Sequence, residues 1–536
     1  MATTTRRSRG APAPAGSIEG QVGQRLLRTF AGRLPDRTIL DVLRGGRAAG
    51  VTLFRADNIE SPAQVRAMTA ALQAARAPGD PPFLIAVDQE GGQLQAIDEG
   101  ATRLPGNLAL GAIGSTELAR RAGNVLGREL AAMGVNVAFA PVCDLLADGL
   151  NPAVGPRSFG ADPTEVGRLA AAMTVGIQET GVAATLKHFP GHGATSGDSH
   201  VGLPVIDRDA AALRSNELPP FAAGIAAGAR LVMLAHLAAP ALTGGHPIAA
   251  TLARPIAHDL LRGELGFAAV SVTDALNMGA IGQGHDLFAS AVDAVSAGND
   301  LILLAHDPAT EDAIHAELVR ALRDGRLDPL EMAQSNARVR SLRGWLGGAR
   351  QPGLDVVGCT EHLAVAREIA ERSVTLVRDH AGLLPLRPAA GERIAVVACM
   401  PVDLTPADTS SFVRLALVEA IARRHPRTDE VTMSLDPTPG EVDAIRLRVA
   451  GASLVVVATF DALNHRGQAV LVERLTADGR PVVAVALRAP FDLEAYPSVT
   501  TYACTYGVQR PSVEALAAAL FAEIPFSGRL PVPLAI

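Results

Sequence analysis

Several kinds of residue are scarce in this chain of 536 residues, and each scarcity excludes a class of protein. Aromatic residues make up only 3% of the sequence, so the core must be built from aliphatic side chains. The four cysteines lie far apart, without the CxxC spacing of a metal or redox motif and without the density of a disulfide framework. A formal net charge of -7 provides no basic face for nucleic acid.

Long apolar runs and a secretion signal are also missing. No run approaches the roughly 20 apolar residues that a membrane-spanning helix needs. Residues 1–16 are rich in threonine, arginine, alanine and proline, and no apolar segment of signal length follows them. We therefore expect a soluble, cytoplasmic protein with a disordered leader over residues 1–16 and no partner among membranes or nucleic acids.

Short apolar runs alternate with amphipathic segments in the first part of the chain. The clearest helix follows Asp162, because Pro163 suits the first helical position and Glu165 completes a capping box. Eight strands that alternate with helices predict a (β/α)8 barrel. The predicted strands cover residues 26–31, 51–54, 83–87, 135–140, 182–186, 231–235, 270–272 and 301–304.

A stretch rich in glycine, at residues 344–353, predicts the end of the barrel. Beyond it, further apolar runs at 393–398, 430–433, 454–458, 482–487 and 500–504 predict a smaller, doubly wound α/β domain. This part has neither GxGxxG nor GxxxxGK[ST], so we expect no nucleotide site there. The expected division is a leader over 1–16, a catalytic barrel over 17–345, a linker and connecting helix over 346–392, and a C-terminal α/β sandwich domain over 393–536.

Residues 187–200 form the densest group of reactive side chains. Three histidines, one lysine and one aspartate stand there among three glycines and one proline, directly after the predicted strand 182–186. Glycine and proline prevent a helix through this stretch, so we expect a loop that places its side chains without regular structure. A loop of this composition at the end of a strand is typical of a functional site.

Other polar residues follow the ends of other predicted strands, where the functional groups of a barrel gather. Asp144 and His236 have two interpretations, since each is equally compatible with lining a site and with a buried hydrogen bond. Arg157 lies in the loop 151–160 and can reach the same mouth of the barrel. The residues at predicted strand ends are Asp88, Glu90, Asp144, Lys187, His188, His236 and Asp274.

These motifs resemble those of glycoside hydrolase family 3, and most closely its bacterial β-N-acetylglucosaminidases of cell-wall recycling. The motifs are residues 88–92, 157–160, 187–193 with 198–200, and 272–278, in matching order and spacing over about residues 20–310. The resemblance implies a retaining, exo-acting enzyme that removes terminal β-linked N-acetylglucosamine from peptidoglycan fragments or short oligosaccharides. It implies no metal and no cofactor, and we expect a monomer or a homodimer.

The resemblance also implies the role of each residue. Asp274 is the nucleophile that forms a glycosyl-enzyme, and His200 is the acid/base, oriented by Asp198. A retaining glycosidase needs a carboxylate nucleophile and a separate proton donor, and a histidine held by a carboxylate can be that donor because it titrates near neutrality. The residues expected to bind the terminal sugar are Asp88, Arg157, Lys187, His188 and, from its strand-end position, His236.

Two positions depart from the pattern of this subgroup. Its members often carry an arginine shortly after the 88–92 motif, whereas residues 93–96 contain none, and Ala194 stands where an acidic residue is frequent. Neither departure removes a catalytic group. Both bear on the affinity for the sugar and on the preferred leaving group.

Other readings of the same residues remain open. The histidines of residues 188–200 and Asp198 are metal-ligand types, although Pro190 and Gly191 prevent a helical HxxxH pair. A serine hydrolase at Ser199 lacks the GxSxG elbow. A broad-specificity β-glucosidase and a β-N-acetylglucosaminide phosphorylase are alternatives within the family, and a non-catalytic sugar-binding protein is the alternative outside enzymes.

Overall fold

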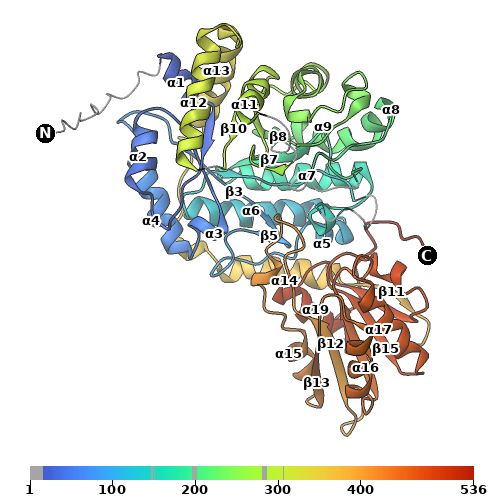
Figure 1. Cartoon of the computed structure of the whole chain (residues 1–536). Helices are drawn as coiled ribbons and strands as arrows, with labels where there is room; N and C mark the ends of the chain where they lie inside the picture. The colour runs from blue at the N-terminus through green and yellow to red at the C-terminus, as the bar shows by residue number, and fades with distance from the viewer. Residues whose placement is uncertain are drawn as a thin grey trace, which may run out of the picture.

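The structure is a computed structural model of the chain, and it describes residues 16–146, 149, 151, 153–195, 202–279, 286–305 and 307–536. Nearly all of the predicted leader lies outside these residues. The chain forms two domains, one after the other in the sequence (Figure 1). The first contains a sheet of eight strands and the second a sheet of six, which confirms a barrel followed by a smaller α/β domain.

The first sheet forms a barrel in which neighbouring strands are parallel. A parallel bridge between Val272 and Leu301 joins its two ends and closes the ring. All eight strands lie where the sequence predicts them, but β7 continues through Phe189 and so includes Lys187 and His188. In pairing order the strands are β10 (Ile302–Leu303), β1 (Leu26–Arg28), β2 (Gly50–Leu53), β3 (Leu84–Val87), β6 (Val137–Ala138), β7 (Ala183–Phe189), β8 (Leu231–Leu234) and β9 (Val270–Thr273).

Helices lie between successive strands and cover the outside of the barrel (Figure 1). The helix predicted after Asp162 is α7, whose first backbone N–H groups donate to the Asp162 carboxylate. The longer helices are α2 (Arg37–Arg44), α4 (Pro62–Gln73), α6 (Thr116–Ala132), α7 (Pro163–Gln178), α9 (Leu218–Ala226), α11 (Leu287–Ser296), α12 (Pro308–Arg323) and α13 (Pro329–Leu346). The shorter ones are α1 (Ile18–Gly23), α3 (Arg55–Asn58), α5 (Asn107–Ile113) and α8 (Ala210–Ala212).

The interior of the barrel is mainly aliphatic, as the scarcity of aromatic residues requires. Side chains such as Leu84, Leu231 and Val270 meet in one buried cluster, and α13 packs Leu342 and Leu346 against it. Burial of this apolar surface stabilises the barrel. The polar residues at the carboxyl ends of its strands are then the candidates for catalysis and binding.

The second sheet has the pairing order β11, β16, β15, β14, β12, β13, and all of its pairs except β11 with β16 are parallel. Its strands are β11 (Thr375–Asp379), β12 (Ile394–Cys399), β13 (Thr428–Met433), β14 (Leu454–Thr459), β15 (Val482–Ala486) and β16 (Thr501–Cys504). Its helices are α15 (Leu417–Ala422), α16 (Pro439–Arg448), α17 (Arg466–Ala477), α18 (Asp492–Ala495) and α19 (Arg510–Leu520).

The strand β11 was not among the five strands predicted for this domain. It lies within residues 346–392, for which the sequence suggested a linker and a connecting helix. An edge strand pairs on one side only and is half exposed, so it needs no continuous apolar run and gives a weak local signal. The connecting helix is α14 (Thr360–Ser373), which packs against α5 and α6 of the barrel and α19 of the second domain.

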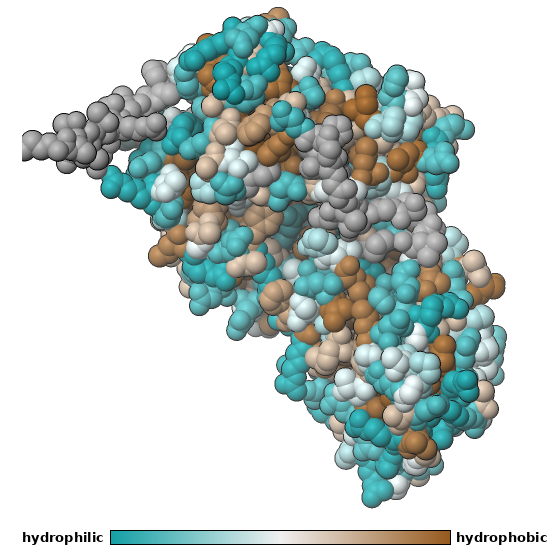
Figure 2. Space-filling view, viewed as in Figure 1, coloured by the Kyte–Doolittle hydropathy of each residue, from teal (hydrophilic) through white to brown (hydrophobic). Residues whose placement is uncertain are grey.

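The end of the chain returns to the barrel. The backbone N–H of Arg529 donates to the carbonyl oxygen of Ala112, and the N–H of Ala161 donates to that of Pro531. Hydrophilic side chains cover much of the visible surface of both domains (Figure 2). In the part of the chain that the structure describes, no helix combines the length and apolar character needed to cross a bilayer.

Candidate active site

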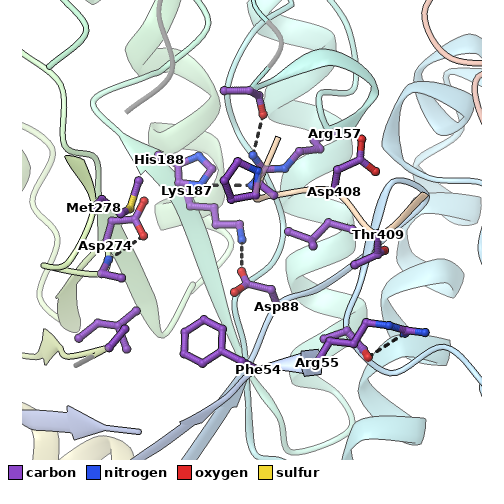
Figure 3. Close-up of a pocket in the computed structure, with 18 of the residues that line it drawn as sticks. Phe54, Arg55, Asp88, Arg157, Lys187, His188, Asp274, Met278, Asp408 and Thr409 are labelled. Carbon is purple, nitrogen blue, oxygen red and sulfur yellow. Dashed lines mark hydrogen bonds and ion pairs between the residues drawn. The ribbon is translucent and has the colours of Figure 1, made fainter. Parts of the chain in front are cut away.

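A cavity of about 620 Å³ lies where the carboxyl ends of the barrel strands meet. Residues after β2, β3, β7 and β9 line it, and residues 403–412, which follow β12 of the second domain, form another part of its wall (Figure 3). Five of the residues proposed from the sequence therefore face one space. They are Asp88, Arg157, Lys187, His188 and Asp274.

Lys187 is the centre of a buried ion-pair network. Its Nζ lies 2.5 Å from Oδ1 of Asp88 and 2.6 Å from Oε1 of Glu90. Burial alone would lower the pKa of Lys187, but the two carboxylates outweigh it and raise that pKa above its ordinary value. The ammonium group is thus held charged and fixed at the base of the cavity. A fixed donor beside the partly exposed Asp88 carboxylate suits the recognition of sugar hydroxyl groups.

Glu90 also holds Arg157. The Nε of Arg157 donates to Oε2 of Glu90 at 2.9 Å, and Nη2 donates to Oε1 at 2.8 Å. Burial would raise the pKa of Glu90, but Arg157 and Lys187 together hold it at about 2. Glu90 lies behind the cavity wall and does not line the cavity. Its position at a strand end therefore indicates a residue that positions Arg157 and Lys187.

His188 and His192 share a buried carboxylate, that of Asp144. The Nδ1 of His188 lies 2.7 Å from Oδ2 of Asp144, and the backbone N–H of His192 donates to Oδ1 at 2.7 Å. Burial would raise the pKa of Asp144, and the nearby histidines lower it to about 2. Of the two interpretations open for Asp144, the structure favours the buried hydrogen bond. With a proton on Nδ1 directed at the carboxylate, His188 presents Nε2 as an acceptor, 3.4 Å from Nη2 of Arg157.

Asp274 directly follows β9, and its backbone N–H donates to the carbonyl oxygen of Leu234 at 3.0 Å. Figure 3 shows Asp274 across the cavity from Arg157. His236 is buried and does not appear among the described residues that line the cavity. Its Nδ1 lies 2.6 Å from the Thr251 hydroxyl, and its Nε2 lies 3.0 Å from the carbonyl oxygen of Ala275. His236 therefore supports the segment that carries Asp274.

Asp198 and His200 lie outside the residues that the structure describes, and so does Ser199. The described part of the same loop is well anchored. The side-chain amide of Asn151 donates to the carbonyl oxygens of His192 and Thr195, at 3.0 and 2.9 Å. Over the described ranges, no three His, Cys, Asp or Glu side chains converge in a way that would hold a metal ion.

The contribution of the second domain was missed by the sequence analysis. Asp403, Asp408, Thr409 and Phe412 line the cavity, although they lie about 100 residues beyond Ala305, the last residue of the barrel in the cavity lining. Residues 403–412 follow the carboxyl end of a parallel strand, β12, which is where open α/β sheets place their ligands. That rule, applied to the second sheet, would have singled them out.

The comparisons with known proteins agree with this geometry. The family model described as "Glycosyl hydrolase family 3 N terminal domain" matches residues 19–342. A glycoside hydrolase family 3 β-N-acetylglucosaminidase from Paenibacillus sp. str. FPU-7 superposes with a TM-score of 0.90 at 34% identity, over 96% of this chain and 99% of that chain.

Two curated relatives are similar at a comparable level. "Beta-N-acetylglucosaminidase/beta-glucosidase" from Cellulomonas fimi is 31% identical over 498 residues, which are 87% of each chain. "Beta-hexosaminidase A" from Pseudoalteromonas piscicida is 34% identical over 363 residues, 63% of this chain, and the match spans 60% of that relative's length. The matched family model spans the whole barrel and the strand ends that form the cavity, and the chain therefore belongs to glycoside hydrolase family 3.

Proposed function

We propose that this protein is a retaining, exo-acting glycoside hydrolase that removes terminal β-linked N-acetylglucosamine. The observation that carries the proposal is the position of Asp274, at a rigid strand end and across one cavity from the fixed cations Lys187 and Arg157. The named activities of the relatives from Paenibacillus and Cellulomonas fimi support this choice of sugar.

Asp88, Lys187, Arg157 and His188 bind the terminal sugar in this proposal. Lys187 and Arg157 are pinned by Glu90, so they offer N–H donors in fixed directions without having to reorganise when substrate arrives. Asp88 and the Nε2 of His188 supply acceptors. His236 acts behind the site, through its contact with Ala275, and keeps the Asp274 segment in place.

The reaction follows from a carboxylate on one face of the sugar and a proton donor on the other. Asp274 attacks the anomeric carbon and forms a glycosyl-enzyme, while His200 protonates the departing oxygen; His200 then removes a proton from the water that releases the sugar. Asp198 orients the His200 imidazole. These two roles rest on the sequence motif, because both residues lie outside the described part of the chain.

We further propose the biological setting and the division of the chain. The substrates are peptidoglycan fragments or short oligosaccharides, met in the cytoplasm by a monomer or a homodimer. The leader covers residues 1–16, the catalytic barrel 17–345, the connecting segment 346–392 and the second domain 393–536. The strand β11 of the connecting segment completes the sheet of the second domain. The enzyme acts without a metal or another cofactor, since Asp274 and His200 provide the nucleophile and the proton.

Product analysis tests this function against its nearest alternative. The relative from Cellulomonas fimi carries β-glucosidase in its name as well, so both nitrophenyl N-acetylglucosaminide and nitrophenyl glucoside should be offered, with and without phosphate. We expect free N-acetylglucosamine of retained configuration and a covalent label on Asp274 after trapping with a fluorinated substrate. Preference for the glucoside, accumulation of a sugar phosphate, or a label on another carboxylate would each require a different assignment.

A further inference from the structure

Arg488 lies at the junction of the two domains and is only 5% exposed. It follows β15, and its Nε and Nη2 donate to Oε1 of Gln93 at 3.1 and 2.8 Å. The same guanidinium lies against the backbone of Gly155, because a Cβ added to Gly155 would stand 2.9 Å from Nη2. One side chain of the second domain therefore touches two separate segments of the barrel.

Those two segments contain Glu90 and Arg157, and they border the cavity proposed to bind the terminal sugar, called here the sugar pocket. Gln93 belongs to the turn between β4 (Gln89–Gly91) and β5 (Leu94–Gln95), a hairpin that begins just after Asp88 and includes Glu90. Gly155 begins the short helical turn Gly155–Arg157. The buried pair between Glu90 and Arg157 joins the hairpin to that turn, so the distance between the two segments decides whether this pair forms.

Other residues of the second domain hold the same hairpin. The backbone N–H and the hydroxyl of Thr409 both donate to the carbonyl oxygen of Gln93 at 2.9 Å, and the Thr409 hydroxyl accepts from the N–H of Gln95 at 3.1 Å. The side-chain amide of Gln509 donates to the carbonyl oxygen of Gly92. The hairpin thus rests on the second domain along its whole turn.

The charge of Arg488 is also accounted for within the second domain. Asp408 and Asp461 feel its positive charge, which opposes the rise that burial causes in their pKa values. Residues 93–96 contain no arginine, and the guanidinium that reaches Gln93 comes from a part of the chain 395 residues away. Arg488 is a buried cation that makes specific contacts with the barrel, and removing the partner of a buried charge is costly.

We propose that Arg488 is a positioning residue of the sugar pocket, through which the second domain sets the spacing between the Glu90 hairpin and the Arg157 turn. Arg488 does not touch the sugar. It acts through Gln93 and Gly155 on the groups that do. This inference rests on the proposed function, since it takes the cavity to be the site of the terminal sugar.

The test compares Arg488→Ala with Arg424→Ala in the full-length enzyme. Arg424 pairs with Glu523 inside the second domain and serves as a matched control for loss of an arginine there. We expect Arg488→Ala to lower kcat/KM on nitrophenyl N-acetylglucosaminide by roughly 10- to 100-fold, because small displacements of positioning groups have effects of this size. The control should stay close to wild type.

Two further measurements keep the test decisive. Gln93→Leu removes the same contact from the barrel side, so the effects of Gln93→Leu and Arg488→Ala should be strongly non-additive in the double variant. If Arg488→Ala does not fold, Arg488→Lys replaces it in this cycle, since it keeps the charge and loses the two-pronged contact. Additive effects, or a kcat/KM of both single variants equal to that of the control, would overturn the proposal.

Hydrogen exchange separates this inference from the proposed function. Loss of Arg488 should accelerate exchange of the amides in residues 89–95 and 153–157, and leave α19 unchanged, whatever the enzyme hydrolyses. A wild-type enzyme without turnover on either glycoside would refute the proposed function but not the positioning role of Arg488. Unchanged exchange in both segments would sink the positioning role even if the enzyme is an active N-acetylglucosaminidase.

Discussion

Glu90 and Arg157 form a buried, two-pronged ion pair, with N···O distances of 2.8 and 2.9 Å. The two residues are 67 positions apart, and neither side chain is more than 5% exposed. Lys187 makes a third contact to the same carboxylate at 2.6 Å. Two buried cations therefore share the carboxylate of Glu90, which lies behind the cavity wall and does not line the cavity.

Removing the charge of Glu90 should destabilise the enzyme strongly. We expect Glu90→Gln to lower the free energy of unfolding by about 3–5 kcal/mol, because Arg157 and Lys187 would lose a buried partner. Thermal and denaturant unfolding measure the change. The exposed pair of Glu165 and Arg168 supplies the control, since Glu165→Gln should change stability by less than about 1 kcal/mol. Equal melting temperatures for both variants would contradict the account given for Glu90.

Asp144 should make the protein sensitive to acid. Its pKa is held at about 2 by the histidines, against an ordinary value of 3.8, so its stabilising effect is present above pH 3.8 and is lost as the pH falls through 2. This difference corresponds to about 2 kcal/mol. Between those pH values the free energy of unfolding should fall more steeply for the wild type than for Asp144→Asn. Parallel curves for the two proteins would argue against a charged Asp144.

Glu217 should have the opposite effect, because its contribution to stability is lost as the pH rises from acidic to neutral. The residue is 3% exposed, its Oε2 has no hydrogen-bond partner among the described residues, and it packs against the backbone of Gly191. Burial raises the pKa of Glu217 to about 7, with Arg208 opposing and Asp144 adding to the rise.

The direction of the pH effect follows because the buried site favours the neutral, protonated form of Glu217. The stability that protonated Glu217 provides is fully present below its ordinary pKa of 4.5 and is lost as the pH rises through about 7. Relative to wild type, Glu217→Gln should gain about 3 kcal/mol in free energy of unfolding over this range. Unfolding curves of both proteins from acidic to mildly alkaline pH measure the gain. A difference that does not change with pH would refute the prediction.

His200, if it is the acid/base, should matter in proportion to how poorly the leaving group departs. A nitrophenol leaves without much protonation, whereas a sugar alcohol needs a proton. His200→Ala should therefore slow cleavage of disaccharides by about 10²–10⁴-fold more than formation of the glycosyl-enzyme from nitrophenyl glycosides. Added azide should restore turnover of the nitrophenyl substrate, because azide attacks without a general base.

Asp198→Ala should show a milder form of the same pattern, since Asp198 orients the imidazole and transfers no proton. Steady-state kinetics on both substrate types, with and without azide, provide the measurement. Equal losses on both substrates without azide rescue would make His200 a binding or structural residue. The proton donor would then have to be sought among other groups, including the second-domain residues that line the cavity.

The sequence by itself determined the barrel and the strand-end positions of most cavity residues. Apolar runs and helix caps are local signals, so the eight strands and α7 could be predicted from short windows. The positions of Asp88, Lys187, His188 and Asp274 near one mouth could be predicted from those strands, because the carboxyl ends of barrel strands converge. The strand β11 escaped this reasoning, since an exposed edge strand lacks a continuous apolar run.

Tertiary structure alone decided how these groups support one another. It placed Glu90 behind the cavity wall, where Glu90 holds Arg157, and it placed His236 against the segment that carries Asp274. It also brought residues 403–412 to a cavity formed mainly by the barrel, and Arg488 to the hairpin beside that cavity. Each of these contacts joins residues that are distant in sequence, and those of Arg488 and residues 403–412 also depend on how the two domains pack together. No local pattern of residues encodes that packing, because the same strand ends and loops are compatible with many relative positions of the two domains.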